Sequence, residues 1–321
     1  MFLKKRMVNE TYYWSIAESY REDGKTKQRI IESLGNTEKA YMRLLDRQGY
    51  EDYLKVIDSY LHTRSPLIWF GGKSRLATKL IDFMPKHITY VEPFGGACHV
   101  LAQKKRSRVE VYNDLDGEVV NFLLVVRDNP DRFYEAVKAL PYARKLYERW
   151  RSSPLPGEPF DRAVRWFYLN RCGVPGAYKG NPGGWKYGKA FNYANTFRSS
   201  CELIKPFAAR LAKVYIEAKD FREIISKYDS PDTFFYIDPP YPGREFRYSG
   251  EFSDQDHFDL AGILSGIKGK VMVSYGENTV ISWLYAGWKR VEIESFAFSK
   301  VVNDGEEKPS RTEIILMNYD L

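Results

Sequence analysis

The residues best suited to chemistry form the string Asp238-Pro239-Pro240-Tyr241, which directly follows the apolar run Thr233–Ile237. An acid at the carboxyl end of a parallel strand lies where open α/β sheets bind ligands. The two prolines fix the backbone and remove two N–H donors, so the Asp238 carboxylate and the Pro239 carbonyl offer only acceptors. Such a turn suits a ligand that carries two N–H donors on one atom, an exocyclic amine, and Tyr241 adds an aromatic face for a planar base. The competing interpretation is a strand-terminating turn in which Asp238 is a helix N-cap.

A second string, Glu92-Pro-Phe-Gly-Gly96, lies between the strand-like run Ile88–Glu92 and a predicted helix. A strand, a glycine-rich turn and a helix start let the backbone approach a ligand closely. The string is not the G-x-G-x-x-G fingerprint of dinucleotide-binding proteins.

A third candidate is Asp114, which ends the next strand-like run, 22 residues after Glu92. An acid at this position holds ribose hydroxyls in nucleotide-binding α/β folds. An N-cap for a helix that begins near Leu115 explains it equally well.

The fourth string is Trp69-Phe-Gly-Gly-Lys73-Ser. A Walker P-loop would need glycine five positions before Gly72, and Leu67 stands there, so we reject an NTPase. The flexible Gly71-Gly72 pair followed by a cation suits a small carboxylate instead.

Alternation of short β-rich runs with amphipathic stretches predicts an α/β fold from residue 66 onward, with a parallel sheet and helices on both faces. The predicted parallel strands are Ile88–Glu92, Val109–Tyr112, Val214–Glu217, Thr233–Ile237 and Lys270–Ser274. Arg290–Phe298 and Thr312–Met317, separated by the polar segment Lys300–Ser310, suit an antiparallel closing hairpin.

The domain organisation follows from two breaks in this pattern. About 100 residues separate the second and third strands, too many for one crossover, so residues 127–213 form an inserted subdomain of the domain 64–126 and 214–321. Residues 1–63 read as a small α+β unit, with Asp-Gly between two strand-like runs and then helical spacing over 38–61.

The 321-residue chain has a net charge of +7, and its basic residues are concentrated in one region. Residues 141–215 hold 14 Lys and Arg against four acids, interleaved with aromatic residues. This composition favours a polyanion partner over a solvated helix face. No apolar run is long enough for a membrane span, no signal peptide is recognisable, and three scattered cysteines suit a reducing cytosol. No cluster of residues suggests a metal, and the four histidines are isolated and read as structural or exposed.

Taken together, the four strings resemble the D12-class (Dam-like) DNA adenine-N6 methyltransferases, and the resemblance covers about residues 66–321. The shared order is Trp-x-Gly-Gly-Lys, the Glu-Pro-Phe loop, a recognition insert and Asp-Pro-Pro-Tyr. The resemblance implies a Rossmann-like methyltransferase sheet, a mostly helical target-recognition insert and S-adenosylmethionine as the methyl donor. It implies transfer to N6 of an adenine flipped out of double-stranded DNA, with no metal.

The resemblance also implies residue roles. Donor-binding positions would be Trp69, Gly71, Gly72, Lys73, Glu92, Pro93, Phe94, Gly95, Asp114, Asp220, Phe221 and Asp238, with Lys73 near the methionine carboxylate. The catalytic loop would be Asp238, Pro239, Pro240 and Tyr241. DNA-contacting positions would be Arg171, Tyr178, Lys179, Trp185, Lys186, Tyr187 and Lys189. Cys98 departs from the family's second glycine. Residues 1–63 lie outside the family and resemble N-terminal segments of some transposases, which suggests an accessory DNA- or partner-binding unit.

Alternatives stay open at this point. Cytosine N4 is also an exocyclic amine, although such enzymes more often carry Ser at the Asp238 position, and RNA adenine is a further acceptor. From another class, the chain could be a non-enzymatic DNA-binding protein of a mobile element, but the intact donor positions disfavour this. A family member of this kind is expected in the cytoplasm of a bacterium or archaeon or encoded by a phage, with or without a cognate restriction endonuclease.

Overall fold

The computed structural model describes all of the chain except residues 9–10, 46, 59, 61–62, 175–182, 244, 246–251 and 297–309. The chain forms two compact units, one of Met1–Thr63 with Gln103–Arg106 and the other of Arg64–Ala102 with Ser107–Leu321. We describe each unit by itself. No helix among the described residues has the length and apolar character needed to cross a bilayer.

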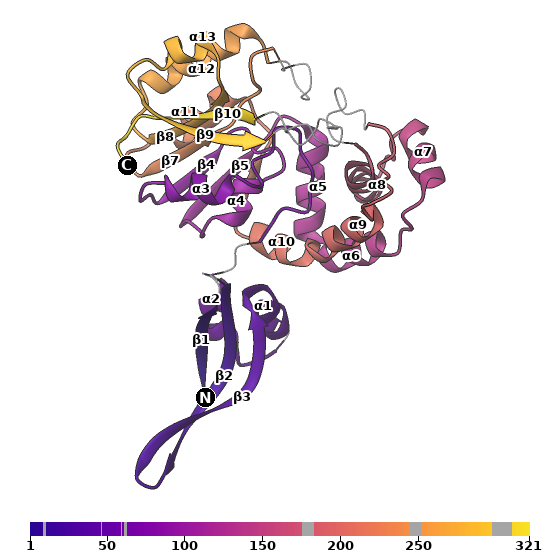
Figure 1. Cartoon of the computed structure of the whole chain (residues 1–321), viewed down its shortest axis with the longest axis vertical. Helices are drawn as coiled ribbons and strands as arrows, with labels where there is room; N and C mark the ends of the chain where they lie inside the picture. The colour runs from indigo at the N-terminus through magenta and orange to yellow at the C-terminus, as the bar shows by residue number, and fades with distance from the viewer. Residues whose placement is uncertain are drawn as a thin grey trace. The chain divides into compact units, whose positions relative to one another are not determined.

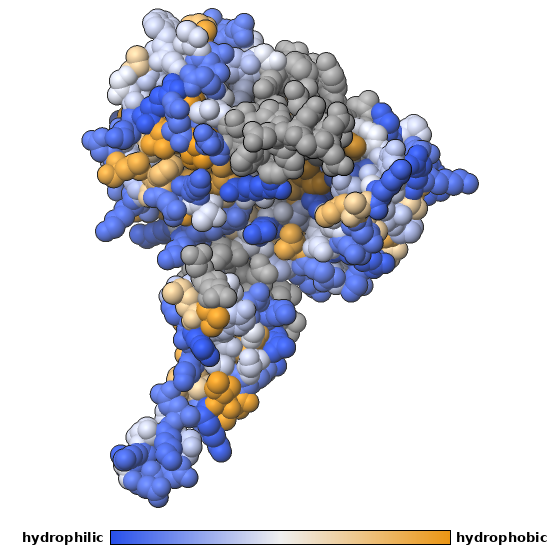
Figure 2. All heavy atoms as spheres, in the orientation of Figure 1, coloured by the Kyte–Doolittle hydropathy of each residue, from blue (hydrophilic) through white to orange (hydrophobic). Residues whose placement is uncertain are grey.

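The smaller unit is a three-stranded antiparallel sheet in the order β1-β2-β3, with two short helices (Figure 1). Its elements are β1 (Phe2–Val8), β2 (Thr11–Glu22), β3 (Lys25–Asn36), α1 (Thr37–Leu45) and α2 (Glu51–Asp58). The turn between β2 and β3 has positive φ at both Asp23 and Gly24, which is what an Asp-Gly hairpin requires. Strand β1 was not predicted from the sequence. The core is small, with Trp14 and Leu34 buried, and the far end of the hairpin is covered by hydrophilic residues (Figure 2).

The larger unit is built on a seven-stranded sheet in the order β6-β5-β4-β7-β8-β10-β9. The strands are β4 (Thr89–Glu92), β5 (Val109–Asn113), β6 (Tyr215–Glu217), β7 (Thr233–Ile237), β8 (Lys270–Gly276), β9 (Lys289–Phe296) and β10 (Ser310–Met317). The first five run parallel, and β10 pairs antiparallel with both β8 and β9. The predicted parallel sheet and closing hairpin are therefore confirmed.

Helices pack on both faces of this sheet, because neighbouring strand residues point to opposite sides. Tyr90 and Phe234 join one hydrophobic cluster, while their neighbours Val91 and Phe235 join the other. The first face is covered by α3 (Ala77–Asp82), α4 (His99–Gln103) and α5 (Gly117–Asp128). The second is covered by α11 (Phe221–Tyr228), α12 (Asp254–Ser265) and α13 (Thr279–Leu284).

The insert between β5 and β6 is helical in its described part, and its helices extend to one side of the sheet beyond α5 (Figure 1). They are α6 (Pro130–Lys138), α7 (Arg144–Ser152), α8 (Pro159–Cys172), α9 (Tyr193–Glu202) and α10 (Ile204–Leu211). The ring of Phe122 on α5 stacks on Phe167 of α8 at 5.6 Å and meets Phe133 of α6 edge-on at 5.6 Å. The insert therefore shares one core with the sheet, and this core holds it in place.

Strand order positions the functional site. Strand β4 lies between β5 and β7. From β4 the chain first adds β5 and β6 on one side, and it then returns to add β7 and β8 on the other side. A crevice forms at the carboxyl ends of the strands at such a switch point, and ligands bind there in open α/β sheets. Glu92 and Asp238 stand at the ends of β4 and β7 and so meet at this crevice.

Candidate active site

A pocket of about 900 Å³, counting the space open to solvent, lies at the carboxyl edge of the sheet around β4, β5 and β7. This is the size of a typical cofactor or small-molecule site. Its lining residues include most of the positions singled out in the sequence: Trp69, Gly72, Lys73, Glu92, Pro93, Phe94, Gly95, Asp114, Phe221, Asp238 and Pro240. Four other predicted positions, Gly71, Asp220, Pro239 and Tyr241, are not part of the lining.

The Asp238 carboxylate is held by donors from two sides. Lys73 Nζ donates to both of its oxygens, at 2.6 and 2.8 Å, and Ser274 Oγ on β8 donates to Oδ1 at 2.9 Å. Among the described residues, the contacts of this carboxylate are with the side chains of Lys73, Ser274 and Tyr241 and not with a helix N-terminus, so they do not support the N-cap interpretation. Burial raises the pKa of the Asp238 carboxyl, while the Lys73 charge opposes this shift. The result is a rigid carboxylate at the pocket wall.

Lys73 is the cation of this site, and its side chain is only 5 % exposed. Besides Asp238, Nζ lies 3.0 Å from Glu313 Oε1 and donates to the Gly71 carbonyl at 3.1 Å. Burial alone would lower the pKa of the Lys73 ammonium, but the two carboxylates raise it well above its usual value. Lys73 is therefore a permanent cation, and in this structure its partners are Asp238 and Glu313.

The loop after β4 needs glycine because aromatic rings lie directly over its backbone. A Cβ on Gly95 would stand 2.1 Å from the ring of Tyr112, and one on Gly96 would stand 2.7 Å from Trp69 Nε1. Gly96 also has φ of +46°, a conformation that costs other residues free energy. The Tyr112 hydroxyl donates to the Gly96 carbonyl at 2.6 Å, which fixes the loop against β5. The glycines thus let the pocket floor form from main chain.

Asp114 lies at the pocket wall and braces the same loop. Its Oδ2 accepts a hydrogen bond from Gly96 N at 2.7 Å, and its Oδ1 accepts one from Asp116 N at 2.8 Å. Burial raises the pKa of Asp114 to about 6, while the backbone donors oppose the rise. The N-cap of α5 is Asp116, which accepts from Glu118 N, so the alternative that Asp114 caps this helix is wrong.

Three phenylalanine rings form an apolar part of the pocket. Phe94 lies 5.4 Å from Phe221 and 5.7 Å from Phe252, and the rings of Phe221 and Phe252 lie 5.9 Å apart. Each comes from a different segment, the loop after β4, the start of α11 and the residues before α12. An apolar slot of this kind suits a flat aromatic ligand.

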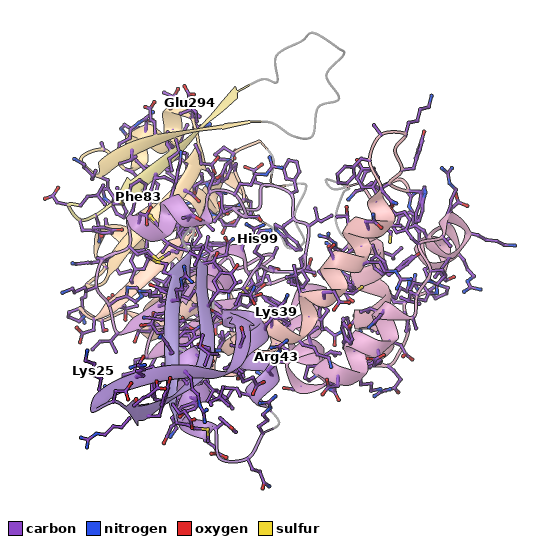
Figure 3. The ribbon with its side chains drawn as sticks, turned by 60° about the horizontal axis from the view of Figure 1, so that its bottom comes forward. Lys25, Lys39, Arg43, Phe83, His99 and Glu294 are labelled. Atoms are coloured by element: carbon purple, nitrogen blue, oxygen red, sulfur yellow. The ribbon has the colours of Figure 1, made fainter. Side chains whose placement is uncertain are left out.

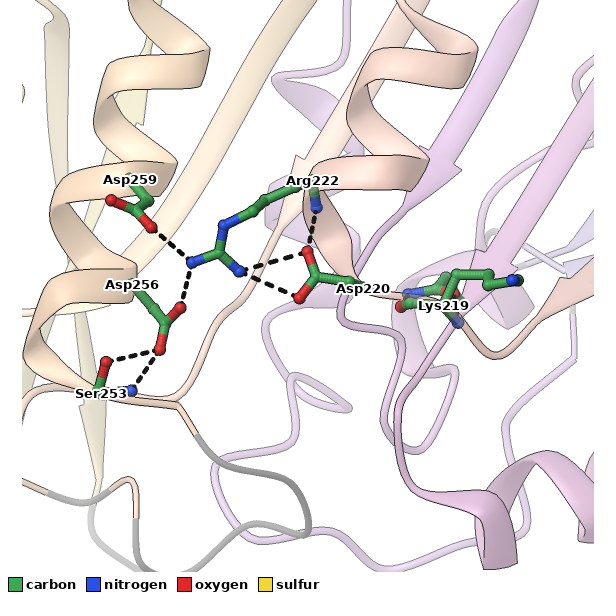
Figure 4. A network of polar contacts seen from close by, with 7 residues as sticks. Lys219, Asp220, Arg222, Ser253, Asp256 and Asp259 are labelled. Carbon is green, nitrogen blue, oxygen red and sulfur yellow. Dashed lines mark hydrogen bonds and ion pairs between the residues drawn. The ribbon is translucent and has the colours of Figure 1, made fainter.

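Asp220, which was predicted to bind the donor together with Phe221, does not line the pocket. Its carboxylate accepts a hydrogen bond from Arg222 N and pairs with the Arg222 guanidinium, which also binds Asp256 and Asp259 on α12 (Figure 4). The neighbours Lys219 and Phe221 line the pocket and Asp220 does not. Its donor-binding role stays a prediction.

The sequence matches the family model of the D12 class N6 adenine-specific DNA methyltransferases over residues 69–297. That match spans most of the chain and every pocket-lining segment. The chain belongs to this family. It is an adenine-specific DNA methyltransferase, and the three alternative interpretations, a cytosine-N4 enzyme, an enzyme acting on RNA adenine and a non-enzymatic DNA-binding protein, are not supported by this match.

Similarity to individual methyltransferases extends over most of both chains. The DNA adenine methylase of Haemophilus influenzae is 26% identical over 253 residues, covering 73% of this chain and 87% of that protein. The Retron Ec67 DNA adenine methylase of Escherichia coli is 27% identical over 264 residues, covering 78% and 90%. The type II methyltransferase M.MjaIII of Methanocaldococcus jannaschii is 23% identical over 290 residues, covering 79% and 98%.

The N-terminal unit has a separate similarity. Residues 3–52 match the family model of the IS1634 family transposase N-terminal domain. This segment is the three-stranded sheet with α1, and it lies outside the methyltransferase match.

The predicted DNA-contacting residues of the methyltransferase have unequal exposure. Tyr187 is 72% exposed and Lys189 is exposed. Trp185 is partly buried and packs on Tyr142 at 4.3 Å and on Tyr147. Tyr178 and Lys179 lie outside the described residues.

Arg171 and Lys186 are partly buried, and they lie close enough for their charges to interact. Burial lowers the pKa of Arg171 to about 10 and that of Lys186 to about 8, and the Arg171 charge lowers the latter further. Within the described part of the chain, no carboxylate forms an ion pair with either of them. Two adjacent cations without a counterion favour an anion as the partner of this surface.

Sequence reasoning missed several residues of the site. His99 at the start of α4, read as structural or exposed, lines the pocket against Gly72 (Figure 3). Burial lowers the pKa of His99 to about 4, so it is neutral at pH 7. Glu313 contacts Lys73 and Tyr241, and its only sequence signal is an acid within the apolar strand Thr312–Met317.

Proposed function

We propose that this methyltransferase binds S-adenosylmethionine in the pocket at the carboxyl edge of the sheet. It transfers the methyl group to N6 of an adenine that has been flipped out of double-stranded DNA. The observation that carries the proposal is the Asp238 carboxylate, which is fixed at the wall of a cofactor-sized pocket and followed by two prolines. The turn offers only hydrogen-bond acceptors, because its two prolines lack N–H groups, so it suits a ligand group that carries N–H donors.

The residues of the pocket fit the donor. The Phe94, Phe221 and Phe252 rings offer an apolar slot for its adenine, and Asp114 offers a carboxylate for its ribose hydroxyls. Gly95 and Gly96 line the pocket with main chain, because the rings of Tyr112 and Trp69 fill the space that their side chains would need. The methionine part of the donor would lie along this main chain. The donor supplies a methyl group that its sulfonium has already activated, so the protein's task is to position the acceptor in line.

Asp238 would act on the acceptor. The lone pair of an adenine amine is delocalised into the ring, so the nitrogen is a weak nucleophile. Acceptors at Asp238 and the Pro239 carbonyl hydrogen-bond both N6 hydrogens, favour a pyramidal nitrogen and stabilise the positive charge that develops as the N–C bond forms. The N6–CH3 bond forms as the S–CH3 bond of the donor breaks, and the donor leaves as a neutral thioether. N6 then loses one proton, which the Asp238 carboxylate would accept.

Lys73 affects this step because it already donates to both Asp238 oxygens. A carboxylate oxygen has two lone pairs, so Oδ2, which accepts from Lys73 among the described residues, can also accept an N6 hydrogen. Lys73 also lines the pocket, where it would contact the methionine carboxylate of the donor.

The insert would bind DNA. Lys189 and Tyr187 are exposed on it, and Arg171 with Lys186 forms a cationic pair suited to a phosphate. Flipping a base costs roughly a few kcal/mol, which contacts to the flipped base and the backbone must offset. DNA as the substrate implies work in the cytoplasm of a bacterial or archaeal cell, including one infected by a phage.

A methyl-transfer assay tests the proposal. Purified enzyme, tritiated donor and unmethylated double-stranded DNA should give N6-methyladenine after digestion to nucleosides, and Asp238→Ala should abolish it while the donor still binds. Full activity of Asp238→Ala, or label recovered only as N4-methylcytosine, would refute it. Asp229→Ala, a change of a carboxylate away from the pocket, is the matched control.

A further inference from the structure

Glu313 reaches the site from a strand that the four catalytic strings do not include. Strand β10 runs antiparallel to β8, with Glu313 opposite Gly276. The start of β10 therefore lies at the same edge of the sheet as the carboxyl ends of β7 and β8. The Glu313 side chain is only 11% exposed. A carboxylate so deeply buried requires compensation, because desolvation of an isolated charge is costly.

That compensation comes from Lys73 and Tyr241. Lys73 Nζ lies 3.0 Å from Glu313 Oε1, and the Tyr241 hydroxyl donates to the same oxygen. The Tyr241 hydroxyl also lies 3.3 Å from Asp238 Oδ1. The contacts connect Asp238 to Glu313 through one ammonium and one phenol, while Glu313 itself is not part of the pocket lining.

The charges of this cluster have a definite balance. One ammonium is shared by two carboxylates at 2.6 and 3.0 Å, so the three side chains together carry one negative charge. If Glu313 were absent, Lys73 and Asp238 would form a neutral pair, and Lys73 would cancel the field of Asp238 at the pocket. Charge interactions are strong at this degree of burial.

We propose that Glu313 is a positioning residue of the methyl transfer: it neutralises Lys73, so that Asp238 presents an uncompensated negative charge to the adenine amine. This inference rests on the proposed role of Asp238. Positive charge develops on N6 as the methyl group arrives, and a net negative wall stabilises that charge more than a neutral ion pair does. Glu313 also holds the Tyr241 hydroxyl and thereby orients the turn that carries Asp238.

The test is Glu313→Gln, which keeps the shape of the side chain and removes its charge. We expect kcat to fall by about tenfold or more, since the effect is on the transition state, while KM for DNA and donor affinity change by less than about threefold. Glu294→Gln is the matched control, because Glu294 is an exposed acid on the neighbouring strand β9 (Figure 3). It should leave kcat unchanged.

The pH profile supplies a readout that structural damage would not mimic. The groups facing Asp238 are Lys73, Ser274, Tyr241, Glu313 and Tyr236. The Glu313 charge raises the pKa of Asp238, so Glu313→Gln should move the acid limb of the kcat profile to lower pH while the plateau falls. Damage to the fold would lower the plateau of kcat without moving the acid limb of the profile to lower pH.

The outcomes separate this inference from the proposed function. A wild-type kcat and acid limb in Glu313→Gln, with Asp238→Ala inactive, would overturn the role of Glu313 alone. An active Asp238→Ala would overturn the proposed function. If the Gln variant does not fold, Glu313→Asp replaces it in the test. Its shorter side chain keeps the negative charge but places the charge farther from Lys73. An intermediate kcat and a smaller shift of the limb would support the inference, and wild-type values of both would contradict it.

Discussion

Lys73 Nζ lies 2.6 and 2.8 Å from the two carboxylate oxygens of Asp238, although 165 residues separate the two in the chain. The contact joins the loop before α3 to the end of β7, across the switch point of the sheet. It connects the Trp69–Ser74 string, which comes first in the chain, to the Asp238–Tyr241 string, which comes last. The pKa of Asp238 therefore depends on a residue that the loop after β7 does not contain.

Replacing Lys73 with Met should impair catalysis most at low pH. The Lys73 charge lowers the pKa of Asp238 against the effect of burial, so its loss raises that pKa and moves the acid limb of activity to higher pH. Single-turnover rates from about pH 5 to about pH 9 measure the limb. Lys79→Met, at an exposed position on α3, is the control, and an unshifted limb in Lys73→Met would contradict the electrostatic coupling.

Donor affinity should depend on the ionisation of Asp114. Burial raises the pKa of this carboxyl to about 6, and only the carboxylate accepts hydrogen bonds with both oxygens. We expect donor binding to weaken as the pH falls through about 6, and this dependence should disappear in Asp114→Asn. Calorimetric titration of the donor across this range checks it; equal pH dependence in both proteins would remove Asp114 from the binding site.

Gly95→Ala should disturb the pocket floor. The new Cβ would lie 2.1 Å from the Tyr112 ring, so the ring or the loop must move, at a cost of about 1–3 kcal/mol of unfolding free energy. Gly117→Ala is matched, because nothing lies within 4 Å of a Cβ there. Urea unfolding and donor titration should separate the two variants, and equal stability would mean that the Tyr112 ring yields freely.

The exposed cation Lys189 should contribute to DNA binding through a phosphate. Lys189→Ala should weaken binding similarly for all sequences and reduce the slope of log K against log salt by about one. Lys227→Ala is the control, because Lys227 on α11 lies outside the insert and pairs with Glu217 on β6. Fluorescence anisotropy at several salt concentrations compares them, and an unchanged slope in Lys189→Ala would exclude a phosphate contact.

The buried pair of Arg210 on α10 and Glu110 on β5 should determine the stability of the insert's attachment. Their side chains are 0% and 2% exposed, with guanidinium contacts at 2.5 and 2.9 Å. Arg210→Met removes the guanidinium that donates to both Glu110 oxygens, and breaking a buried ion pair in this way typically costs about 3–5 kcal/mol. Urea unfolding measures the loss, and the double variant Arg210→Met with Glu110→Leu should recover much of it. A loss below that of Lys227→Met would refute this prediction.

Much of the site was predictable because its signals are local. A buried strand followed by Asp238 and two prolines, and a strand followed by glycines at 95 and 96, are patterns within about ten residues. Parallel strands bring their carboxyl ends to one edge, so Asp238, Glu92 and Asp114 could be expected to meet. The alternation of strands and helices predicted the sheet for the same reason.

The remaining features depend on packing between segments far apart in the chain. The sequence predicts that Thr312–Met317 pairs antiparallel with Arg290–Phe298, but nothing near Glu313 indicates that β10 also pairs with β8 and so delivers this acid to the same edge. Trp185, which precedes Lys186 in the sequence, packs on Tyr142, a contact that nothing in the local pattern indicates, and its role in DNA binding stays a prediction. His99 looked isolated and lines the pocket.

The sequence by itself determined the family, the parallel sheet and the acceptor turn at Asp238, since these follow from residue types at short spacing. Only the tertiary structure decided the partners of that turn: Lys73 between Asp238 and Glu313, and Ser274 from β8. The physical reason is that a buried charge must find its counterions in three dimensions, and strand order, which short-range patterns do not encode, selects which residues are within reach.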